Sequence, residues 1–302
     1  MEQGSNPDFG RRVFFLNPPY AIKTTVVERL QSQEYEAFYI EDYHNAKPIL
    51  QKYRDSICFI NIDDGLTIKE WFNFVKSFAS DHVLSTIYLG ILSQKAKLSE
   101  KNEFILKTNI PGGFIMLDEG LEKISDKITK ICELNGAKGR RQYVRLNCKN
   151  LKDATVHISK DGHLYTFKLI DISSVGFACA VSPHESTKFK DKEILRSVVI
   201  SIGSKTINCE AAIFAIKPGN PSSTIVMLLM PTTPVSTKNL IRKYVFTNMQ
   251  AEIKGLEDCS IADMTDYSKE KKEDIISNTT FVTDLSGDGI GCFADLEELE
   301  EI

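Results

Sequence analysis

The sequence predicts two folded domains of different classes, an α/β doubly wound domain followed by an antiparallel β-barrel that ends in a helix. Residues 12–135 alternate short apolar runs with segments of helical periodicity, which is typical of a parallel sheet covered on both faces. Residues 136–253 carry short strands separated by tight turns. At 302 residues, 42% hydrophobic and 26% charged, the chain has the length and composition of two globular domains.

Five strand-like runs define the first domain. They occupy residues 13–16, 37–40, 57–60, 86–89 and 114–117. Apolar residues at helical spacing lie between them, for example Ile68, Trp71, Phe72 and Val75, or Leu121, Ile124, Ile128 and Ile131. We therefore expect a five-stranded doubly wound sheet, in which a functional site lies at the carboxyl ends of the strands.

Hairpin turns define the second domain. Asp161-Gly162 and Gly203-Ser204 each separate two apolar runs, and dipeptides of this kind favour two-residue hairpins. Further runs at 211–216 and 224–229 bring the number of strands to six or seven, which favours a small closed barrel. Residues 237–253 then predict an amphipathic helix that closes one end of the barrel.

The two ends of the chain are expected to lack fixed structure. Residues 1–11 are predicted to be flexible. Residues 252–302 hold 15 acidic and 4 basic side chains, so that a chain with net charge −4 carries +7 in its remainder. We expect 254–302 to be an acidic, partly disordered tail that is solvated rather than folded over a cationic pocket.

A cluster of arginines stands at the start of the predicted barrel. Arg140, Arg141 and Arg145 follow a Gly-Ala-Lys-Gly linker at 136–139. Guanidinium groups bind phosphate through two parallel hydrogen bonds and stack on purine rings. The cluster therefore predicts an anionic, nucleotide-like ligand.

A second motif follows in a strand-like stretch downstream, where Asp171, Ser173 and Gly176 form the pattern D-x-S-x-x-G. Such a turn offers carboxylate acceptors, a hydroxyl group and, at glycine, free access for a flat base. Taken alone, either motif is also compatible with a surface ion pair or an ordinary bulged turn. Taken together on one barrel, they favour a ligand site.

R-x-x-x-R followed by D-x-S-x-x-G, within residues 138–253, resembles the PilZ family of cyclic di-GMP receptors. The resemblance implies that Arg141 and Arg145 bind phosphate and guanine, that Asp171 accepts hydrogen bonds from guanine N1 and N2, and that Ser173 bonds nearby. It implies that Gly176 leaves space or adopts an unusual backbone angle. Arg140, directly before the motif, implies an intercalated pair of ligand molecules.

The first domain resembles, in architecture only, the receiver domain of response regulators. The residues of phosphotransfer are expected to be missing, because the first strand runs into Asn17-Pro18, the fourth ends near Leu89-Gly90, and Asp118 stands where a receiver has its lysine. Asp63 and Asp64 follow the third strand without a metal-binding pair or that lysine. We expect a pseudo-receiver that does not accept phosphate.

These observations predict a cytoplasmic, bacterial signal-transduction protein that binds cyclic di-GMP without catalysis. It would transmit a conformational change to an unidentified protein partner through the receiver-like domain. The alternative is an adaptor that binds no nucleotide. No cofactor or metal is expected. Neither a signal peptide nor an apolar run of about 18 residues is found, so no membrane insertion is predicted.

Other functions are not favoured. The five histidines lack a neighbouring nucleophile, and no Walker A, G-x-G-x-x-G or H-E-x-x-H sequence occurs, so we predict no enzyme. A pI near 5.8 does not favour nucleic acid as a partner. The seven cysteines are scattered singly and are expected to be reduced and mostly buried.

The tail contains a partial repeat of the second motif. Residues 284–289 read D-x-S-x-D-G, as in D-x-S-x-x-G, but no arginine cluster precedes them. We rank a partial structural echo first and a plain turn second. Calcium binding ranks third, because Gly291 and Asp295 depart from the calcium-loop pattern.

Overall fold

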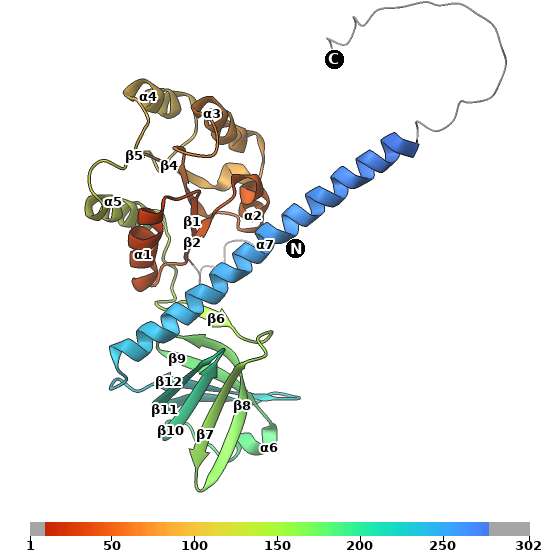
Figure 1. The fold of residues 1–302 in the computed structure, drawn as a ribbon. Helices are drawn as coiled ribbons and strands as arrows, with labels where there is room; N and C mark the ends of the chain where they lie inside the picture. Colours follow the sequence, from red (N-terminus) through yellow and green to blue (C-terminus); the bar gives the residue numbers. More distant parts are fainter. Residues whose placement is uncertain (1–9, 278–302) are drawn as a thin grey trace, which may run out of the picture. The chain divides into compact units, whose positions relative to one another are not determined.

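The computed structural model describes the backbone of residues 10–277 and the side chains of residues 10–256. Its first sheet contains five parallel strands in the order β2-β1-β3-β4-β5 (Figure 1). Their bounds are β1 Val13–Leu16, β2 Ala37–Ile40, β3 Ile57–Asn61, β4 Tyr88–Ser93 and β5 Phe114–Met116. This order is the flavodoxin-like form of a doubly wound sheet, which confirms the predicted class of the first domain.

Helices cover both faces of this sheet (Figure 1). Alternate residues of β1 face opposite sides, because Phe14 belongs to the core cluster that contains Trp71, whereas Phe15 belongs to the cluster that contains Ile128. The helices on the Phe15 side are η1 (Ile22–Val27), α1 (Glu28–Ser32) and α5 (Leu121–Leu134). Those on the Phe14 side are α2 (Ala46–Lys52), α3 (Ile68–Ser77) and α4 (Leu98–Lys107).

The fourth strand differs from the prediction. It begins at Tyr88 and ends at Ser93, because Thr86 closes a 3-10 turn (Leu84–Thr86) and is not part of a strand. Gly90 does not end the strand but lies inside it. A Cβ at this position would be 2.8 Å from the ring of Phe59, so the glycine permits a close approach between neighbouring strands. A serine therefore stands at the carboxyl end of β4.

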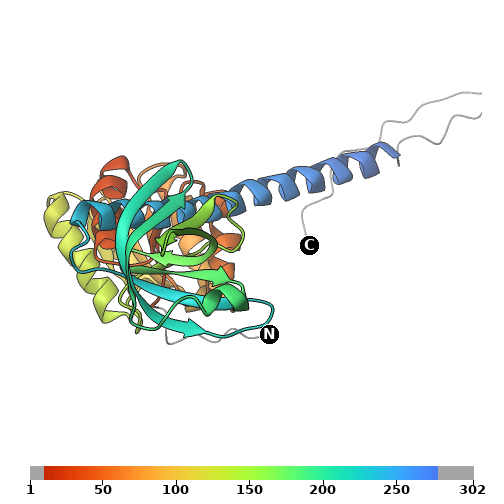
Figure 2. The same ribbon diagram turned by 90° about the horizontal axis from the view of Figure 1, so that it is seen from below.

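The second sheet is antiparallel and closes on itself, as Figures 1 and 2 show. Six strands follow the order β8-β7-β10-β11-β12-β9, and β8 also pairs with β9, while β6 adds to the free side of β8. The bounds are β6 Arg145–Asn147, β7 Ala154–Lys160, β8 His163–Ser173, β9 Gly176–Val181, β10 Ile194–Ile202, β11 Lys205–Lys217 and β12 Ser223–Leu229. A short helix, α6 (Pro183–Ser186), follows β9. The predicted barrel is confirmed.

Both predicted hairpin turns are present. Asp161 and Gly162 have φ angles of 51° and 76° between β7 and β8, and Gly203 has a φ angle of 55° between β10 and β11. Asp161-Gly162 has a positive φ angle at both central residues and Gly203-Ser204 only at the first, and both kinds of two-residue turn match the twist of paired strands. Local sequence alone therefore sets these two registers.

The last helix, α7, spans Val235–Ser277 and extends well past its predicted end at residue 253. A lone glycine costs a helix only about 1 kcal/mol relative to alanine, and Gly255 stands between the good helix formers Lys254 and Leu256. The predicted end of this helix at residue 253 is thus wrong, and α7 continues to residue 277 within the segment expected to be partly disordered. The chain forms two units, Met1–Ser260 and Ile261–Ile302, and both domains belong to the first. The partial repeat at 284–289 lies outside the described residues.

Helix α7 also covers the edge strand of the first sheet. The side-chain amide of Gln250 accepts a hydrogen bond from Tyr39 N at 3.1 Å and donates one to Tyr39 O at 2.8 Å. The rings of Phe246 and Phe38 lie 6.2 Å apart. Because β2 is an edge strand, Gln250 satisfies backbone groups that a further strand would otherwise pair. In the described part of the chain, no helix combines the length and apolar character needed to cross a bilayer.

Candidate functional site

The pairing of β6 with β8 brings the two sequence motifs together. Arg145 opens β6 and lies opposite Ser173, and Asn147 lies opposite Asp171. Arg145 Nη1 is 4.0 Å from Asp171 Oδ1, with 49% and 31% of the two side chains exposed. The arginine segment and the D-x-S-x-x-G turn therefore form one surface of the barrel.

The D-x-S-x-x-G turn joins β8 to β9. Ser173 is buried, and its hydroxyl donates to the carbonyl oxygen of Gly176 at 3.0 Å, which closes the turn. A Cβ at Gly176 would stand 2.4 Å from Met227 O, and the residue has no positive φ angle. Glycine is thus needed here for close approach to β12, not for an unusual backbone angle. In this conformation Ser173 shapes the turn and does not face solvent.

Arg140 and Arg141 lie before β6 in an exposed segment. Arg141 lines a cavity of about 20 Å³ together with Arg145, Tyr143 and Glu34. A cavity of this size holds about one water molecule. A dinucleotide can enter only if the arginine segment or Glu34 moves.

The linker that precedes the arginines packs against the start of the chain. Arg11 N donates to Gly136 O at 2.8 Å, and a Cβ at Gly10 would stand 2.2 Å from Ala137 O. The ammonium group of Lys138 lies 4.6 Å from the centre of the Tyr35 ring, a cation–π distance. These contacts hold residues 136–138 against the first domain, and the arginines follow later in the segment.

A carboxylate from the first domain reaches between the two motifs. Glu34 lies in the turn between α1 and β2, with a φ angle of 64° and 8% of its side chain exposed. Its oxygens accept hydrogen bonds from Val144 N at 3.0 Å, Ser174 Oγ at 2.7 Å and Arg242 Nε at 2.8 Å. Val144 lies within R-x-x-x-R, and Ser174 lies within D-x-S-x-x-G.

Sequence reasoning missed this contact. Three basic residues on one helix, here Lys238, Arg242 and Lys243, are typical of a solvated helix face. For Arg242 this is wrong, because it is ion-paired to Glu34 and only 21% of its side chain is exposed. Glu34 precedes Val144 by 110 residues and Arg242 by 208, so no local pattern signals the cluster.

The carboxyl ends of the parallel strands carry a second charged cluster. Asp63 accepts hydrogen bonds from Ser93 Oγ at 2.5 Å, Gln94 N at 2.7 Å and Lys95 N at 3.2 Å. Lys95 Nζ also binds Asp64 Oδ1 at 2.9 Å, and this hydrogen bond raises the pKa of Lys95. The predicted end of the fourth strand near Leu89-Gly90 is therefore wrong, and the strand ends instead at Ser93 within this cluster.

This second cluster still departs from a phosphotransfer site. After β1 the chain offers Asn17 rather than a carboxylate pair, and its backbone oxygen binds the side chain of Asn61 at 2.9 Å. The carboxylate of Asp63 already meets three donors. The negative charge of Asp63 and Asp64 is thus neutralised by neighbouring donors, and the described loop after β1 supplies no acidic pair for a magnesium ion.

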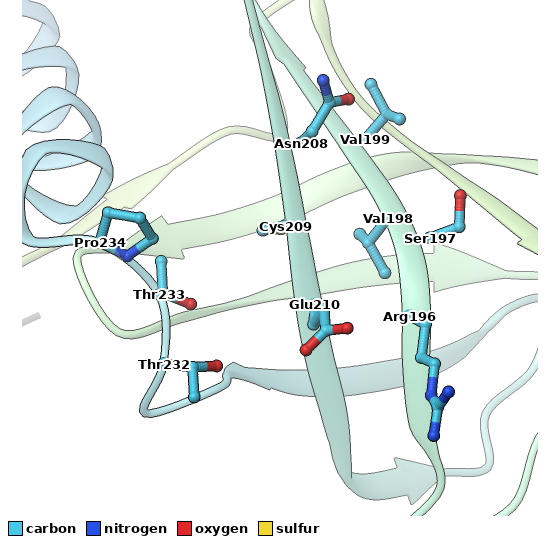
Figure 3. Close-up of a pocket in the computed structure, with 10 residues that line it drawn as sticks. All are labelled: Arg196, Ser197, Val198, Val199, Asn208, Cys209, Glu210, Thr232, Thr233 and Pro234. Carbon is cyan, nitrogen blue, oxygen red and sulfur yellow. The ribbon is translucent and has the colours of Figure 1, made fainter.

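A larger cavity than the one beside Arg141 lies elsewhere on the barrel. It has a volume of about 410 Å³ and is lined by residues of β10, β11 and the loop that enters α7, which Figure 3 draws as sticks. Arg196 and Glu210 are its charged residues. It contains none of the predicted site residues, and size alone does not make it the better candidate.

No protein-family model and no curated protein match this sequence. Solved structures with low sequence identity to this chain include the following three. The PilZ domain of YcgR from Escherichia coli with c-di-GMP is 14% identical, with a TM-score of 0.34, over 38% of this chain and 97% of that one. The K. pneumonia MrkH–c-di-GMP complex is 17% identical, with a TM-score of 0.34, over 38% of this chain and 55% of that one. Vibrio cholerae CheY4 is 17% identical, with a TM-score of 0.34, over 40% of this chain and 98% of that one.

Proposed function

We propose that this protein is a cyclic di-GMP receptor that acts without catalysis. The observation that carries the proposal is the β6–β8 pairing, which sets Arg145 beside Asp171. The ligand has two phosphates and two guanines. Arginine can bind phosphate or the O6 and N7 atoms of guanine, and a carboxylate can accept hydrogen bonds from N1 and N2.

The loose contact between the two residues leaves both of them available. At 4.0 Å, Arg145 and Asp171 are at the outer limit of an ion pair, so the donors and acceptors are not saturated. A charge-assisted hydrogen bond contributes about 1.5–3 kcal/mol net. Two or three such bonds are consistent with micromolar or tighter binding.

The response to the ligand is proposed to be a rearrangement of residues 135–145 between the two domains. These residues join α5 to β6, so movement of the arginines changes how the receiver-like domain is held. A protein partner would then recognise the surface that is exposed or hidden by this change. No cofactor takes part.

An adaptor that binds no nucleotide is the second candidate. Helix α4 exposes 72% of Leu98, 47% of Ile105 and 81% of Leu106. Apolar side chains gathered on one exposed helix are typical of a protein interaction surface. The adaptor reading predicts partner binding that is insensitive to cyclic di-GMP, whereas a receptor predicts that the nucleotide changes it.

The test is a binding assay on the nucleotide-stripped protein with Arg141→Ala and Asp171→Ala. We expect each to weaken cyclic di-GMP binding about a hundredfold or more. Arg196→Ala, which changes the larger cavity, is the matched control and should bind as the wild type does. If neither Arg141→Ala nor Asp171→Ala loses affinity for cyclic di-GMP, the proposed site is wrong. A stoichiometry that falls from two to one in Arg140→Ala supports the intercalated pair.

A further inference from the structure

Three hydrogen-bond donors converge on the carboxylate of Glu34 at the barrel surface. They are a backbone amide from the arginine segment (Val144), a hydroxyl from the D-x-S-x-x-G turn (Ser174) and a guanidinium group from α7 (Arg242), at 3.0, 2.7 and 2.8 Å. Only 8% of the Glu34 side chain is exposed. An amide, a hydroxyl and a guanidinium directed at one buried point make a site for an anion.

All three donors belong to the barrel and its helix, whereas the acceptor comes from the first domain. Without Glu34, the half-buried charge of Arg242 would lose its counter-ion, which is costly in a partly dehydrated environment. Glu34 is held in a left-handed turn, and the adjacent Tyr35 packs beneath Lys138. The first domain therefore inserts one negative charge into a cationic site of the second.

We propose that this is a phosphate site of the barrel and that Glu34 occupies it in place of a ligand phosphate. This inference rests on the proposed function, and it adds Ser174, Arg242 and the amide of Val144 to the nucleotide-binding residues. The phosphate of cyclic di-GMP and the carboxylate of Glu34 compete for the same three donors. Binding of the nucleotide thus expels Glu34 and releases one contact between the domains.

The position of the site relative to the motifs favours a nucleotide phosphate. Val144 directly precedes Arg145, and Ser174 directly follows Ser173. Glu34 also lines the cavity of about 20 Å³ next to Arg141 and Arg145. Withdrawal of this side chain enlarges that cavity on the side of the arginines. A phosphate held there stands where both motifs can reach the rest of the ligand.

Because Glu34 competes for the three donors, the measured affinity for cyclic di-GMP is lower than the affinity of a protein whose donors are free of Glu34. If the donors are free of Glu34 in only about a tenth of the molecules, the apparent affinity falls about tenfold. Substitution of Glu34 removes this competitor, and substitution of Arg242 removes a phosphate ligand. The two residues of one ion pair are therefore expected to change nucleotide affinity in opposite directions.

The experiment is calorimetric titration of the full chain with cyclic di-GMP. We expect Glu34→Gln and Glu34→Ala to bind about tenfold more tightly than the wild type, and Arg242→Gln to bind about tenfold more weakly. Asp126→Asn is the matched control. It breaks the ion pair of Asp126 with Arg29 (2.6 Å) inside the first domain, and should leave the affinity within about twofold.

Two outcomes overturn the proposal. If both Glu34→Gln and Arg242→Gln bind cyclic di-GMP more tightly, the ion pair only holds the two domains together and Arg242 is no phosphate ligand. If Glu34→Ala binds the nucleotide as the wild type does, Glu34 does not compete with it. A second probe separates this inference from the proposed function. Inorganic pyrophosphate should shift the amide resonance of Val144 in Glu34→Ala and leave it in place in Glu34→Ala/Arg242→Gln. If the Val144 resonance shifts in neither variant, the proposed anion site is wrong, even if the nucleotide binds elsewhere.

Discussion

Two charged clusters in this protein contain similar residues and differ in what they leave available. At the carboxyl ends of the parallel strands, Asp63 accepts hydrogen bonds from three donors at 2.5 to 3.2 Å. On the barrel, Asp171 meets Arg145 only at 4.0 Å, and both side chains are partly exposed. The first cluster is satisfied by its own loops. The second retains hydrogen-bonding capacity for a ligand.

The difference arises from where the donors come from. Ser93, Gln94 and Lys95 follow one another at the end of β4, next to the strand that precedes Asp63, so the sheet itself fixes their approach. Arg140 and Arg141 precede β6, and Arg145 is the first residue of this strand, which has three residues and lies at the outside of the barrel. Segments with few paired backbone groups open at low free-energy cost, which suits a segment that must fold over a ligand.

The largest effect should come from Arg145→Ala on the barrel. We expect cyclic di-GMP affinity to fall about a hundredfold, equivalent to about 2.7 kcal/mol. The free energy of unfolding should change by less than about 0.5 kcal/mol, because the side chain is half exposed and loosely paired. Titration calorimetry and urea denaturation measure the two quantities. A large loss of stability would show that Arg145 is structural.

Gly176→Ala should damage the same region through packing. The added methyl group would stand 2.4 Å from Met227 O, a backbone atom that cannot move without disturbing β12. Overpacking of this kind costs about 1–3 kcal/mol. Urea denaturation should show this loss. A variant as stable as the wild type would mean that β9 and β12 move apart more easily than their pairing indicates.

Asp63→Ala should lower the free energy of unfolding and leave nucleotide affinity unchanged, which is the opposite of what we expect for Arg145→Ala. Removal of the carboxylate leaves the Ser93 hydroxyl and the amides of Gln94 and Lys95 without their acceptor, and should lower the free energy of unfolding by about 1–2 kcal/mol. Nucleotide affinity should not change. Equal stability of variant and wild type would show that water replaces the carboxylate, and the contrast between the clusters would lose its basis.

The smallest expected effect is that of acetyl phosphate with magnesium. We expect no covalent mass increase on the peptide that contains Asp63 and Asp64, because the first acidic residue is already saturated and Asn17 supplies no carboxylate for the metal. Mass spectrometry of the digested protein measures this. Transfer of a phosphoryl group to that peptide would contradict the pseudo-receiver interpretation and make Ser93 and Lys95 candidate phosphotransfer residues.

Local patterns predicted most of the fold. Asp161-Gly162 specified a hairpin through positive φ angles, and the apolar strands specified a buried parallel sheet. The fourth strand was misplaced because Gly90 was interpreted as an end, whereas it allows contact with Phe59. The polar, acidic sequence after residue 253 predicts a tail, whereas helix α7 continues to Ser277.

The candidate site was predictable only in part. Both motifs carry recognisable residue spacings, so Arg145 and Asp171 were found before their strands were known to pair. Glu34 and Arg242 were not found, because their roles depend on a contact between residues 208 positions apart. Ser174 was passed over because it is an unspecified position of the motif, although its hydroxyl binds Glu34.

The proposed function requires that the barrel bind cyclic di-GMP where its two motifs meet. Titration calorimetry of the purified, nucleotide-stripped wild-type protein with this nucleotide tests it most directly. We predict saturable heat with a dissociation constant in the micromolar range or below. The absence of heat at several temperatures, from protein whose folded state is verified by circular dichroism, would contradict the account.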